Sequence, residues 1–342
     1  MSPNADGAPR VRLARITDLS ALVEISRRAQ RTLQEGSGEM RSLGLPLGPA
    51  ALSLYQLFRM PLSLIRSSDS IWIHQRGAFA DGLARVERDE RGDWTIVELD
   101  AVDDAARARL LARIAREAGR HGVVRVHVAC AEDAATLLLL GSAGFQPYAR
   151  ETLYARKGGL PIASSGARIV LRAAQPSDAL RIAQLMSVTT PPAVSRMELI
   201  ETREWERAAA GTWAPRASIT PLLRLAEQSA FVVDSAEGEI DAWVHLGVAR
   251  EIGEEHPHAL RISLLPGVDA EPLFQASLAE LAERAKRAGT TENSILAVVR
   301  SYEGGLGAAL TAQGFTPIGD LRLAMRDARA RVTAPGMLPA IG

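Results

Sequence analysis

The chain carries one opening phrase twice, and this internal repeat restricts its fold more than any other feature of the sequence. Residues 12–22 read Arg-Leu-Ala-Arg-Ile-Thr-Asp-Leu-Ser-Ala-Leu, and residues 172–182 read Arg-Ala-Ala-Gln-Pro-Ser-Asp-Ala-Leu-Arg-Ile, an offset of 160 residues from Arg12 to Arg172. Each phrase predicts a short strand, then an Asp suited to capping a helix, and then an amphipathic helix. We therefore expect two copies of one folding unit.

A closing phrase recurs as well. Ala-Gly-Phe-Gln-Pro at 143–147 corresponds to Gln-Gly-Phe-Thr-Pro at 313–317, and the glycines of the two phrases, Gly144 and Gly314, are 170 residues apart. The two offsets differ only by the length of the intervening loops, so the repeat spans most of each half. A chain of 342 residues also agrees with two domains, because a domain commonly contains roughly 150 residues.

The segments between these phrases predict the same order of elements in both halves. Strand pairs flank glycine turns, a further strand leads into an amphipathic helix, and an apolar strand follows that is buried on both faces. A second helix then ends at the Gly-Phe phrase, and a last strand closes the unit. These elements are strands at 71–74, 80–86, 94–101, 123–129 and 152–155 with a helix at 105–120, and strands at 230–233, 240–248, 260–265, 294–299 and 321–325 with a helix at 270–288.

Composition places the boundaries of the two units. Residues 158–167 are rich in Gly, Ser and Pro and are expected to be a linker, and residues 1–10 and 328–342 are expected to be a disordered N-terminal tail and a C-terminal tail. The first unit then covers 11–157 and the second unit covers 168–327.

The charge balance limits the classes of partner. The 40 basic residues equal the 40 acidic residues, so no net field favours a nucleic acid or a membrane. Only Lys157 and Lys286 are lysines, which is typical of a GC-rich, bacterial genome. Cys130 is the single cysteine, which excludes an internal disulfide and a cysteine-built metal site. No apolar run reaches the roughly 18 residues of a membrane span, and we expect a cytoplasmic protein without a metal.

Four features taken in order resemble the acetyl-coenzyme A-dependent N-acyltransferases of the GNAT superfamily. They are the opening Arg-x-Ala-x-x-x-Asp, the Val-Val-Asp-x-x-Glu-Gly-Glu-Ile hairpin at 232–240, the strand-to-helix step after Trp94, and the Gly-Phe after the last long helix. The resemblance covers about 11–157 and 167–326. It implies an α/β protein of two tandem GNAT-like domains, each with a mixed central sheet flanked by helices.

The resemblance also implies a cofactor and a reaction, the transfer of an acyl group from acetyl-coenzyme A to an amine. In this superfamily the pantetheine arm pairs with the backbone of the fourth strand where that strand separates from the fifth, which here implies Leu99, Ala101 and Val102. The pyrophosphate binds at the start of the following helix, because a helix N-terminus offers free N–H groups. Arg107 and Arg109 lie on that helix and are candidates for reaching back to the phosphates.

Both phosphate loops depart from the Arg/Gln-x-x-Gly-x-Gly/Ala pattern of the superfamily. Residues 99–111 contain no glycine, and residues 264–274 contain one. Acidic side chains stand at both helix starts instead, where they either repel a phosphate or cap the helix with their own carboxylates. These acids are Asp103, Asp104, Asp269 and Glu271.

Glu98 is the candidate general base, because several members of the superfamily keep a glutamate in the fourth strand. The alternative is a solvent-facing residue of a half-exposed strand. The second half has no acid at the matching place, where Arg261 and Ser263 are the polar residues.

A tyrosine on the last long helix often protonates the departing thiolate in this superfamily. Tyr302 stands too early for that role and is better explained as a cap or core residue.

Histidines and the cysteine give no further site. His256 and His258 are close in sequence, but two ligands alone rarely hold zinc, and a solvated loop pair is the simpler interpretation. Cys130 is expected to be a buried, inert thiol. The segments that shape an acceptor pocket in the superfamily, 36–60 and 189–225, differ strongly between the halves, so the halves are expected to do different jobs.

Two functional hypotheses follow. The chain is either an N-acetyltransferase that uses the first half with Glu98 to acylate a small-molecule or peptide amine, or a catalytically silent GNAT-like binding or interaction module without tight coenzyme A binding. The altered phosphate loops favour the second hypothesis. The sequence leaves a homo-oligomer open.

Overall fold

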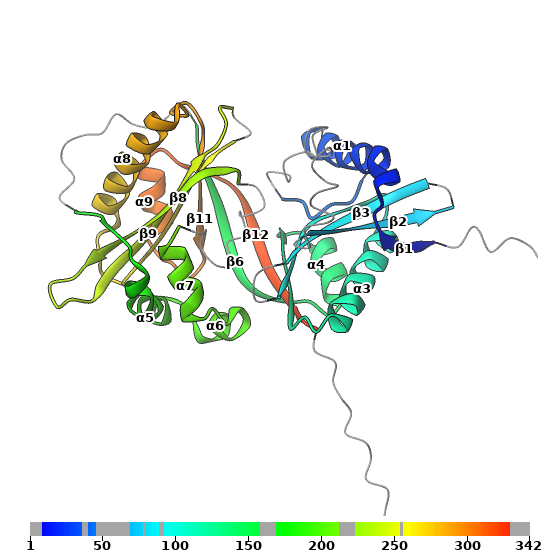
Figure 1. The fold of residues 1–342 in the computed structure, drawn as a ribbon, viewed down its shortest axis with the longest axis horizontal. Helices are drawn as coiled ribbons and strands as arrows, with labels where there is room; N and C mark the ends of the chain where they lie inside the picture. Colours follow the sequence, from blue (N-terminus) through cyan, green and yellow to red (C-terminus); the bar gives the residue numbers. More distant parts are fainter. Residues whose placement is uncertain are drawn as a thin grey trace, which may run out of the picture.

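The structure is a computed structural model in which two lobes lie side by side (Figure 1). It describes residues 9–35, 40–45, 69–77, 79–88, 92–157, 169–211, 223–253 and 256–328.

The strands within the described ranges form one continuous sheet of twelve that runs through both lobes. Neighbouring strands are antiparallel except for β4–β5 and β10–β11, which are parallel, so the expected mixed sheet is confirmed. In sheet order the strands are β1 (Arg10–Leu13), β2 (Asp69–Arg76), β3 (Phe79–Arg88), β4 (Trp94–Ala101), β5 (Arg125–Ala131), β12 (Thr316–Asp327), β6 (Gln146–Arg156), β11 (Ile295–Arg300), β10 (His258–Leu264), β9 (Ile240–Ala249), β8 (Leu225–Asp234) and β7 (Arg172–Ala173).

The two halves exchange their last strands. Strand β12 of the second half pairs with β5 of the first, and β6 of the first half pairs with β11 of the second. The exchanged strands also pair with each other where the lobes meet (Figure 1). The structure therefore differs from the expectation that each last strand closes its own unit. The side-chain alternation of a strand is the same beside either neighbour, so the sequence pattern did not identify the partner.

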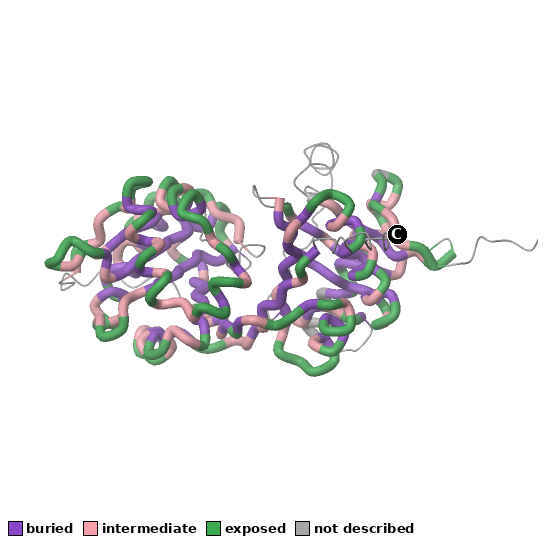
Figure 2. The backbone as a smooth tube through the Cα atoms, turned by 90° about the horizontal axis from the view of Figure 1, so that it is seen from below, coloured by how far each residue is buried: buried purple, intermediate pink, exposed green. Residues whose placement is uncertain are grey.

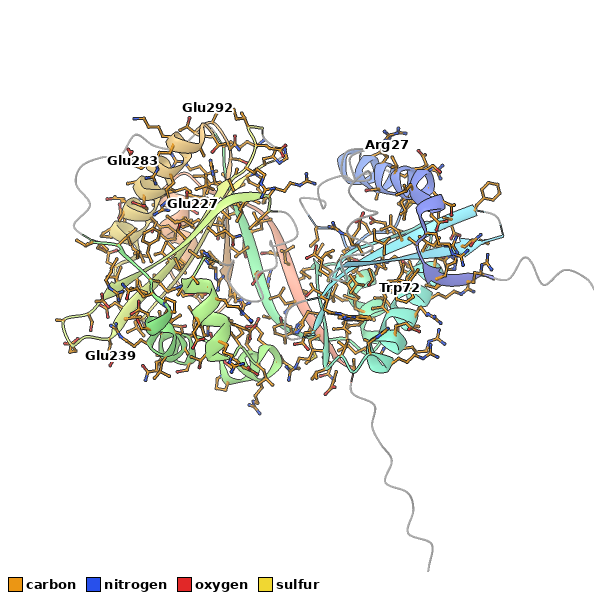
Figure 3. All side chains as sticks on the ribbon, in the orientation of Figure 1. Arg27, Trp72, Glu227, Glu239, Glu283 and Glu292 are labelled. Carbon is orange, nitrogen blue, oxygen red and sulfur yellow. The ribbon has the colours of Figure 1, made fainter. Side chains whose placement is uncertain are left out.

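Helices cover both faces of the sheet in the first lobe. The turn η2 (Ile16–Asp18) and α1 (Leu19–Glu35) cover one face, and α3 (Asp104–Arg120) and α4 (Ala134–Ser142) cover the other. Helix α3 buries Leu110, Leu111 and Ile114, which the 3.6-residue spacing places on one side. Trp72 packs between the sheet and α3 (Figure 3).

The second lobe has the same layers. One face carries η3 (Pro176–Asp178), α5 (Ala179–Thr189), α6 (Pro192–Glu198) and α7 (Thr202–Ala209), and the other carries α8 (Ala270–Ala288) and α9 (Leu306–Ala312). Buried residues follow the strands and the inner sides of these helices, and exposed residues lie mainly outside (Figure 2). Helices α3 and α8 begin and end within one residue of their expected bounds.

The repeated opening phrase folds the same way in both halves. Asp18 accepts hydrogen bonds from both terminal nitrogens of Arg12 at 2.7 and 2.8 Å, and Asp178 accepts them from Arg172 at 2.8 and 3.1 Å. The arginine in each pair holds the pKa of its carboxyl below the ordinary value. These aspartates therefore tie the helix back to the first strand, and Asp178 makes no side-chain cap of α5.

The closing phrase also has one structure. Gly144 and Gly314 have positive φ of 83° and 81°, a conformation that glycine adopts without steric cost. Each ends a helix and turns the next residue, Phe145 or Phe315, into the core, where these side chains are 3% and 1% exposed. The two Gly-Phe phrases therefore mark equivalent points of the two halves.

Candidate functional site

The gap between β4 and β5 is the place that the resemblance assigns to the cofactor. The two strands pair only as far as Ile96 and Val128. In β4, Ile96 lies opposite Val86 and Glu98 lies opposite Arg85, so Val97 is an extra residue in a β-bulge. Beyond this bulge β4 and β5 separate, as the superfamily resemblance predicts.

Glu98 is buried on the face of β4 that α1 covers. Its carboxylate lies 3.4 Å from the Ser26 hydroxyl and 3.6 Å from Nε of Arg85, and the residue is 4% exposed. Burial raises the pKa of Glu98, although Arg85 opposes this shift. Asp100 is buried beside it, and burial together with the charge of Glu98 holds the pKa of Asp100 well above its ordinary value. Glu98 is therefore not a solvent-facing residue, while its role as a base stays a prediction.

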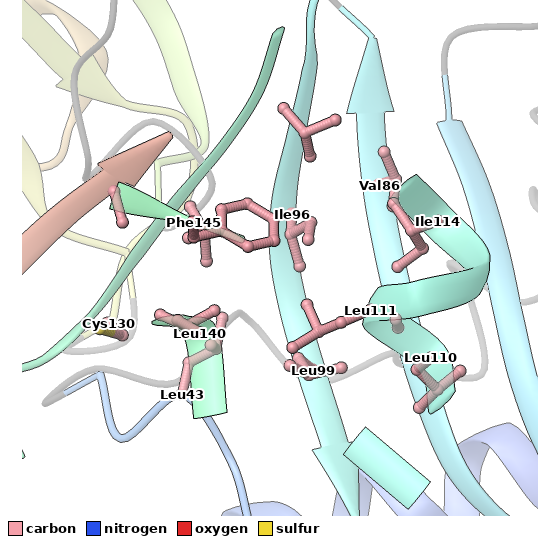
Figure 4. Packing of buried hydrophobic residues seen from close by; sticks show 14 of the residues in the cluster. Leu43, Val86, Ile96, Leu99, Leu110, Leu111, Ile114, Cys130, Leu140 and Phe145 are labelled. Atoms are coloured by element: carbon pink, nitrogen blue, oxygen red, sulfur yellow. The ribbon is translucent and has the colours of Figure 1, made fainter. Parts of the chain in front are cut away.

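Residues 40–45 cross the gap between β4 and β5, and we call them the bridging segment. Arg41 exchanges two backbone hydrogen bonds with Ala101 at the end of β4, at 2.7 and 2.9 Å. On the other side, the Leu43 carbonyl accepts from the amide of Ala131 at the end of β5, at 2.8 Å. Leu43 and Leu45 are buried, and Leu43 lies beside Leu140 in the core (Figure 4). The chain itself thus fills the separated ends of the two strands.

The start of α3 is also occupied by the chain's own groups. The Asp103 carboxylate accepts from the amide of Ala106 at 2.7 Å, and Arg76 donates to the same carboxylate at 2.9 Å. Arg107 is buried and donates to the Thr136 hydroxyl at 3.2 Å. Its guanidinium also lies 3.6 Å from the Asp104 carboxylate at the start of α3, so both contacts are made to the chain's own groups.

The remaining candidates for cofactor binding also contact other residues of the chain. Leu99 is part of the core, and the amide of Val102 donates to the Asp81 carbonyl at 3.0 Å. The guanidinium of Arg109 lies 3.4 Å from Nε2 of His74. The described residues of the first lobe therefore do not fit a coenzyme A bound as the resemblance implies.

In the second lobe a side chain bridges the corresponding gap. Strands β10 and β11 pair only as far as Leu260 and Ala297. Just beyond, the guanidinium of Arg261 donates to the Val298 carbonyl at 3.2 Å and to the Glu303 carboxylate at 2.6 Å. At the start of α8, Asp269 caps the helix by accepting from the amide of Glu271 at 3.0 Å.

A cavity of about 400 Å³ opens beside this bridge, between the sheet and α5–α7. Its polar part is a buried cluster around Arg300. The guanidinium of Arg300 pairs with Glu151 at 2.9 Å and with Glu198 at 2.7 Å, and donates to the Tyr302 hydroxyl at 2.8 Å. Glu151 belongs to β6, so the exchanged strand of the first half supplies an acid to the cavity of the second lobe.

Burial and charge set the protonation of this cluster. Burial alone would lower the pKa of Arg300, but Glu198 and Glu151 hold it above its ordinary value. Burial raises the pKa of Glu303, against the opposing charge of Arg261. It also raises the pKa of Tyr302, which lies in the turn after β11 and precedes α9. Tyr302 thus does not cap a helix. It packs against the core cluster of Ala149, Val194 and Leu323, as the core alternative expects, and it lines the cavity.

The other residues considered from the sequence have structural roles. His258 is buried, with its ring nitrogens near the Thr290 carbonyl and the Ala249 amide. Burial raises the pKa of Cys130 to about 12, as expected for an inert thiol.

Within the described ranges there is no group of three or more His, Cys, Asp or Glu side chains arranged to hold a metal ion. The segment 36–60 lies outside the described residues except for 40–45.

Sequence reasoning missed Glu151, Glu198 and Arg300. Their contact depends on the strand exchange, because Glu151 and Arg300 are cross-strand neighbours of β6 and β11. No motif or spacing relates an acid before the linker to an arginine 149 positions later.

Apart from α6 and α7, the described elements follow the same order in both lobes, and each lobe has a separated parallel strand pair. This arrangement defines a protein with the tandem GNAT fold. Comparison with solved structures agrees. A GCN5-related N-acetyltransferase from Sphaerobacter thermophilus superposes with a TM-score of 0.55 at 13% identity, with 94% of this chain and 96% of that chain covered. A tandem GNAT protein from the clavulanic acid biosynthesis pathway superposes with a TM-score of 0.52 at 12% identity, with 94% and 99% covered.

At these identities the likeness shows the fold alone. No protein-family model matches the sequence, and no curated protein matches it. None of the helices in the described part of the chain has the length and apolar content that a membrane span requires.

Proposed function

We propose that this tandem GNAT-fold chain binds a ligand or partner and has lost tight binding of coenzyme A. The observation that carries the proposal is the pairing of Arg41 with Ala101, because it uses the backbone groups at the end of β4 that the resemblance assigns to pantetheine. Each copy of the fold would then serve as a scaffold. In the first copy the bridging segment closes the gap between β4 and β5.

The physical basis is competition. To enter the gap, a pantetheine arm must break the backbone bonds of the bridging segment and expose Leu43 and Leu45. Burial of one leucine is worth about 1.5–3 kcal/mol, so the two leucines alone weaken binding by about two powers of ten or more. At the helix starts, the carboxylates of Asp103 and Asp269 use the amides of Ala106 and Glu271, and their charge repels a pyrophosphate.

Thermal unfolding with acetyl-coenzyme A tests the proposal. A ligand at about one hundred times its Kd stabilises a protein by roughly 2.7 kcal/mol, so the intact chain should show no shift of Tm at millimolar acetyl-coenzyme A. A clear shift at micromolar concentration would return the chain to the active acyltransferases.

A matched pair of glycine variants sharpens this test. Gly44 and Gly77 have nearly the same φ, 66° and 63°, so both Gly→Ala changes carry similar backbone strain. A Cβ on Gly44 meets the Ala131 Cβ at 3.0 Å, whereas a Cβ on Gly77 meets nothing within 4 Å. Gly44→Ala should therefore loosen the bridging segment and increase any shift with acetyl-coenzyme A, while Gly77→Ala should not. Equal behaviour of the two variants would remove the bridging segment as the cause.

Acetyl transfer in the first lobe is the second candidate function. It is favoured by the burial of Glu98 on the α1 face of β4 and by the raised pKa of its carboxyl, because a raised pKa makes a carboxylate a stronger base. A small-molecule or peptide amine would be the acceptor. If the chain acetylates an amine, Glu98→Gln should lower the rate by about 10²–10⁴-fold, and the exposed Glu24→Gln should leave it unchanged. An unchanged rate in Glu98→Gln would remove the assignment.

We also propose bounds for the two units, a location and a class of partner. Residues 11–157 and 168–327 are proposed as the two units of the fold, joined by a linker at 158–167. A cytoplasmic location is proposed from the sequence, with a small molecule or peptide and not a nucleic acid as partner. Fractionation of the native source and a filter-binding assay with nucleic acid test these points.

A further inference from the structure

The outer edge of the sheet in the first lobe has the features of a docking surface, which neither cofactor gap explains. We propose that a partner protein with an extended acidic segment adds a strand to β1 at this edge and places its carboxylates beside the arginines of α3. This inference rests on the proposed binding function and names the class of partner and the surface that binds it.

Strand β1 directs backbone groups to its outer side. It is the first strand in the sheet order, and no strand of the described ranges lies beyond it (Figure 1). It is antiparallel to β2, and the amide of Ala14, just after β1, donates to the Ile71 carbonyl at 2.8 Å. Alternate residues of an antiparallel strand bond to the same neighbour, so the backbone groups of Val11 and Leu13 point outward. The Leu13 carbonyl accepts from the Arg12 side chain at 3.1 Å, and the amide and carbonyl of Val11 face the place of an added strand.

A hollow of about 240 Å³ lies between this edge and α3. Pro9 and Val11 line it from the strand, and Ala112 lines it from the helix. Sites that hold a small molecule commonly measure roughly 300–1,000 Å³, so this hollow suits a side chain of a docked segment better than a free ligand. Leu13 is 50% exposed on the same strand, and an added strand would cover it.

The helix contributes positive charge to the hollow. Arg109, Arg113 and Arg116 line it, and no acid is among its described lining residues. Arg113 pairs with Glu117 at 3.2 Å. In the described part of the chain, Arg109 and Arg116 have no carboxylate partner. Their guanidinium groups can therefore pair with carboxylates of a partner.

Positive charge extends to the other face of the edge. Arg10 alternates with Val11 along the strand and therefore lies on that face. It is exposed, donates to the Gln75 side chain at 3.3 Å, and has no carboxylate partner among the described residues. A second copy of β1 paired at this edge would bring two such sets of arginines together, and like charges repel. An acidic strand gains ion pairs in addition to the backbone bonds, so charge complementarity selects it over a second copy or a neutral segment.

The spacing of the arginines agrees with the spacing of a strand. A helix rises about 1.5 Å per residue, so Arg109 and Arg113 are about 6 Å apart along the axis of α3. Alternate residues of a strand are about 6.7 Å apart and point to the same face. Acids at alternate positions of the added strand can therefore each meet one arginine.

Fluorescence anisotropy on the full chain with labelled peptides tests the proposal. The peptides alternate Thr with Glu, Gln or Lys, so that they differ mainly in charge. We expect the Glu peptide to bind at least tenfold more tightly than the Gln peptide at low salt, and the Lys peptide not to bind. The advantage of the Glu peptide should shrink at high salt, because salt screens exposed charges. Equal affinity for the Glu and Gln peptides, or no binding of the Glu peptide at millimolar concentration, would overturn the inference.

N-methylated Glu peptides test whether the segment binds as a strand. In an added strand, alternate amides point to β1 and the others point away from it. Methylation of the Glu amides or of the Thr amides should therefore abolish binding in one series and leave it intact in the other. Equal effects in both series would refute strand addition. A dimer of the chain that dissociates as the peptide binds would also refute the proposal, because a second copy would then occupy the edge.

Variants connect the result to this edge. Arg109→Gln together with Arg116→Gln should weaken binding of the Glu peptide at least tenfold and leave the Gln peptide unchanged. Arg27→Gln together with Arg31→Gln is the matched control, because both arginines are exposed on α1, where Arg27 points away from the sheet (Figure 3). Ala112→Phe fills the hollow without changing its charge and should weaken binding of both peptides. If Ala112→Phe fails to fold, the two arginine pairs still decide the location, and unchanged binding in the α3 pair refutes it.

The experiment also separates this inference from the proposed loss of coenzyme A binding. All peptide titrations are made without acetyl-coenzyme A. Failure of the Glu peptide to bind, together with no thermal shift by acetyl-coenzyme A, would refute the docking surface and leave the proposed loss intact. Binding of the Glu peptide together with micromolar binding of acetyl-coenzyme A would support the docking surface and refute the proposed loss.

Discussion

Replacement of Arg300 by Met is the sharpest perturbation of the contact between the halves. The side chain is 6% exposed and pairs with Glu151 of β6 and Glu198 of α6, so its removal takes a guanidinium counter-ion away from two buried carboxylates. Removing one partner of a buried ion pair costs about 3–5 kcal/mol, because the remaining charge is not compensated. We expect Arg300→Met to lower the free energy of unfolding by that amount and Tm by roughly 6–20 °C, at about 2–4 °C per kcal/mol.

Arg150→Met is the matched control. Arg150 also pairs with two carboxylates, those of Glu132 and Asp320, but it is 45% exposed. Exposed ion pairs contribute about 1 kcal/mol or less, so this variant should change little. Urea unfolding of the intact chain, with Tm measured in parallel, compares the two variants directly.

Removal of the two acids should rescue the variant. In the Arg300→Met chain, Glu151→Gln together with Glu198→Gln removes the uncompensated charges and should restore most of the lost stability. A loss equal to that of Arg150→Met would refute the cluster as a link between the halves.

Two further predictions concern the exchanged strands and the buried acids of β4. Fragments that end and begin within 158–168 should each fail to unfold cooperatively but should assemble when mixed, because each lacks the strand that the other supplies. Cooperative unfolding of one fragment alone would contradict this exchange. The pKa of Asp100 is raised above 3.8, so its ionisation destabilises the fold as pH rises from about 4. Asp100→Asn should therefore become more stable relative to the parent with rising pH, by about 1.4 kcal/mol per unit of pKa shift. A difference that does not change with pH in urea titrations would contradict the burial of this charge.

Local features of the fold could be predicted from the sequence because their causes are local. The expected strand at 94–101 has the same bounds as β4, and the expected helix at 270–288 has those of α8. Apolar spacing defines the helices, and glycines with positive φ mark their ends and the hairpin turns. Such signals lie within a few residues of the feature that they predict.

The partners of β6 and β12 could not be predicted in this way. A strand between two neighbours shows the same alternation of side chains whichever chain segment lies beside it. The sequence of residues 152–155 is therefore equally compatible with β5 or β11 as the neighbour. The buried cluster of Arg300 depends on that choice. Arg300 follows the expected strand at 294–299 and Glu151 precedes the expected strand at 152–155, so neither residue was singled out from the sequence.

The candidate site of the first lobe could be predicted only in part, because some of its contacts are made by backbone atoms. Asp103 was weighed as a helix cap from its sequence position, and it does cap α3. The contact of Arg41 with Ala101 joins residues 60 positions apart through backbone atoms, which every residue type provides. A pairing made by backbone leaves no pattern of side chains, so the closed gap between β4 and β5 had no sequence signal.

The strand exchange places an acid of the first half in the cavity of the second lobe. Glu151 stands at the floor of the second cavity only while β6 lies between β12 and β11. Strand β12 in turn keeps that place by pairing with β5 of the first lobe. A ligand that binds against Glu151 therefore stabilises the packing of both lobes. The first half, closed at its own cofactor gap, would then act on the second cavity by holding this acid in place.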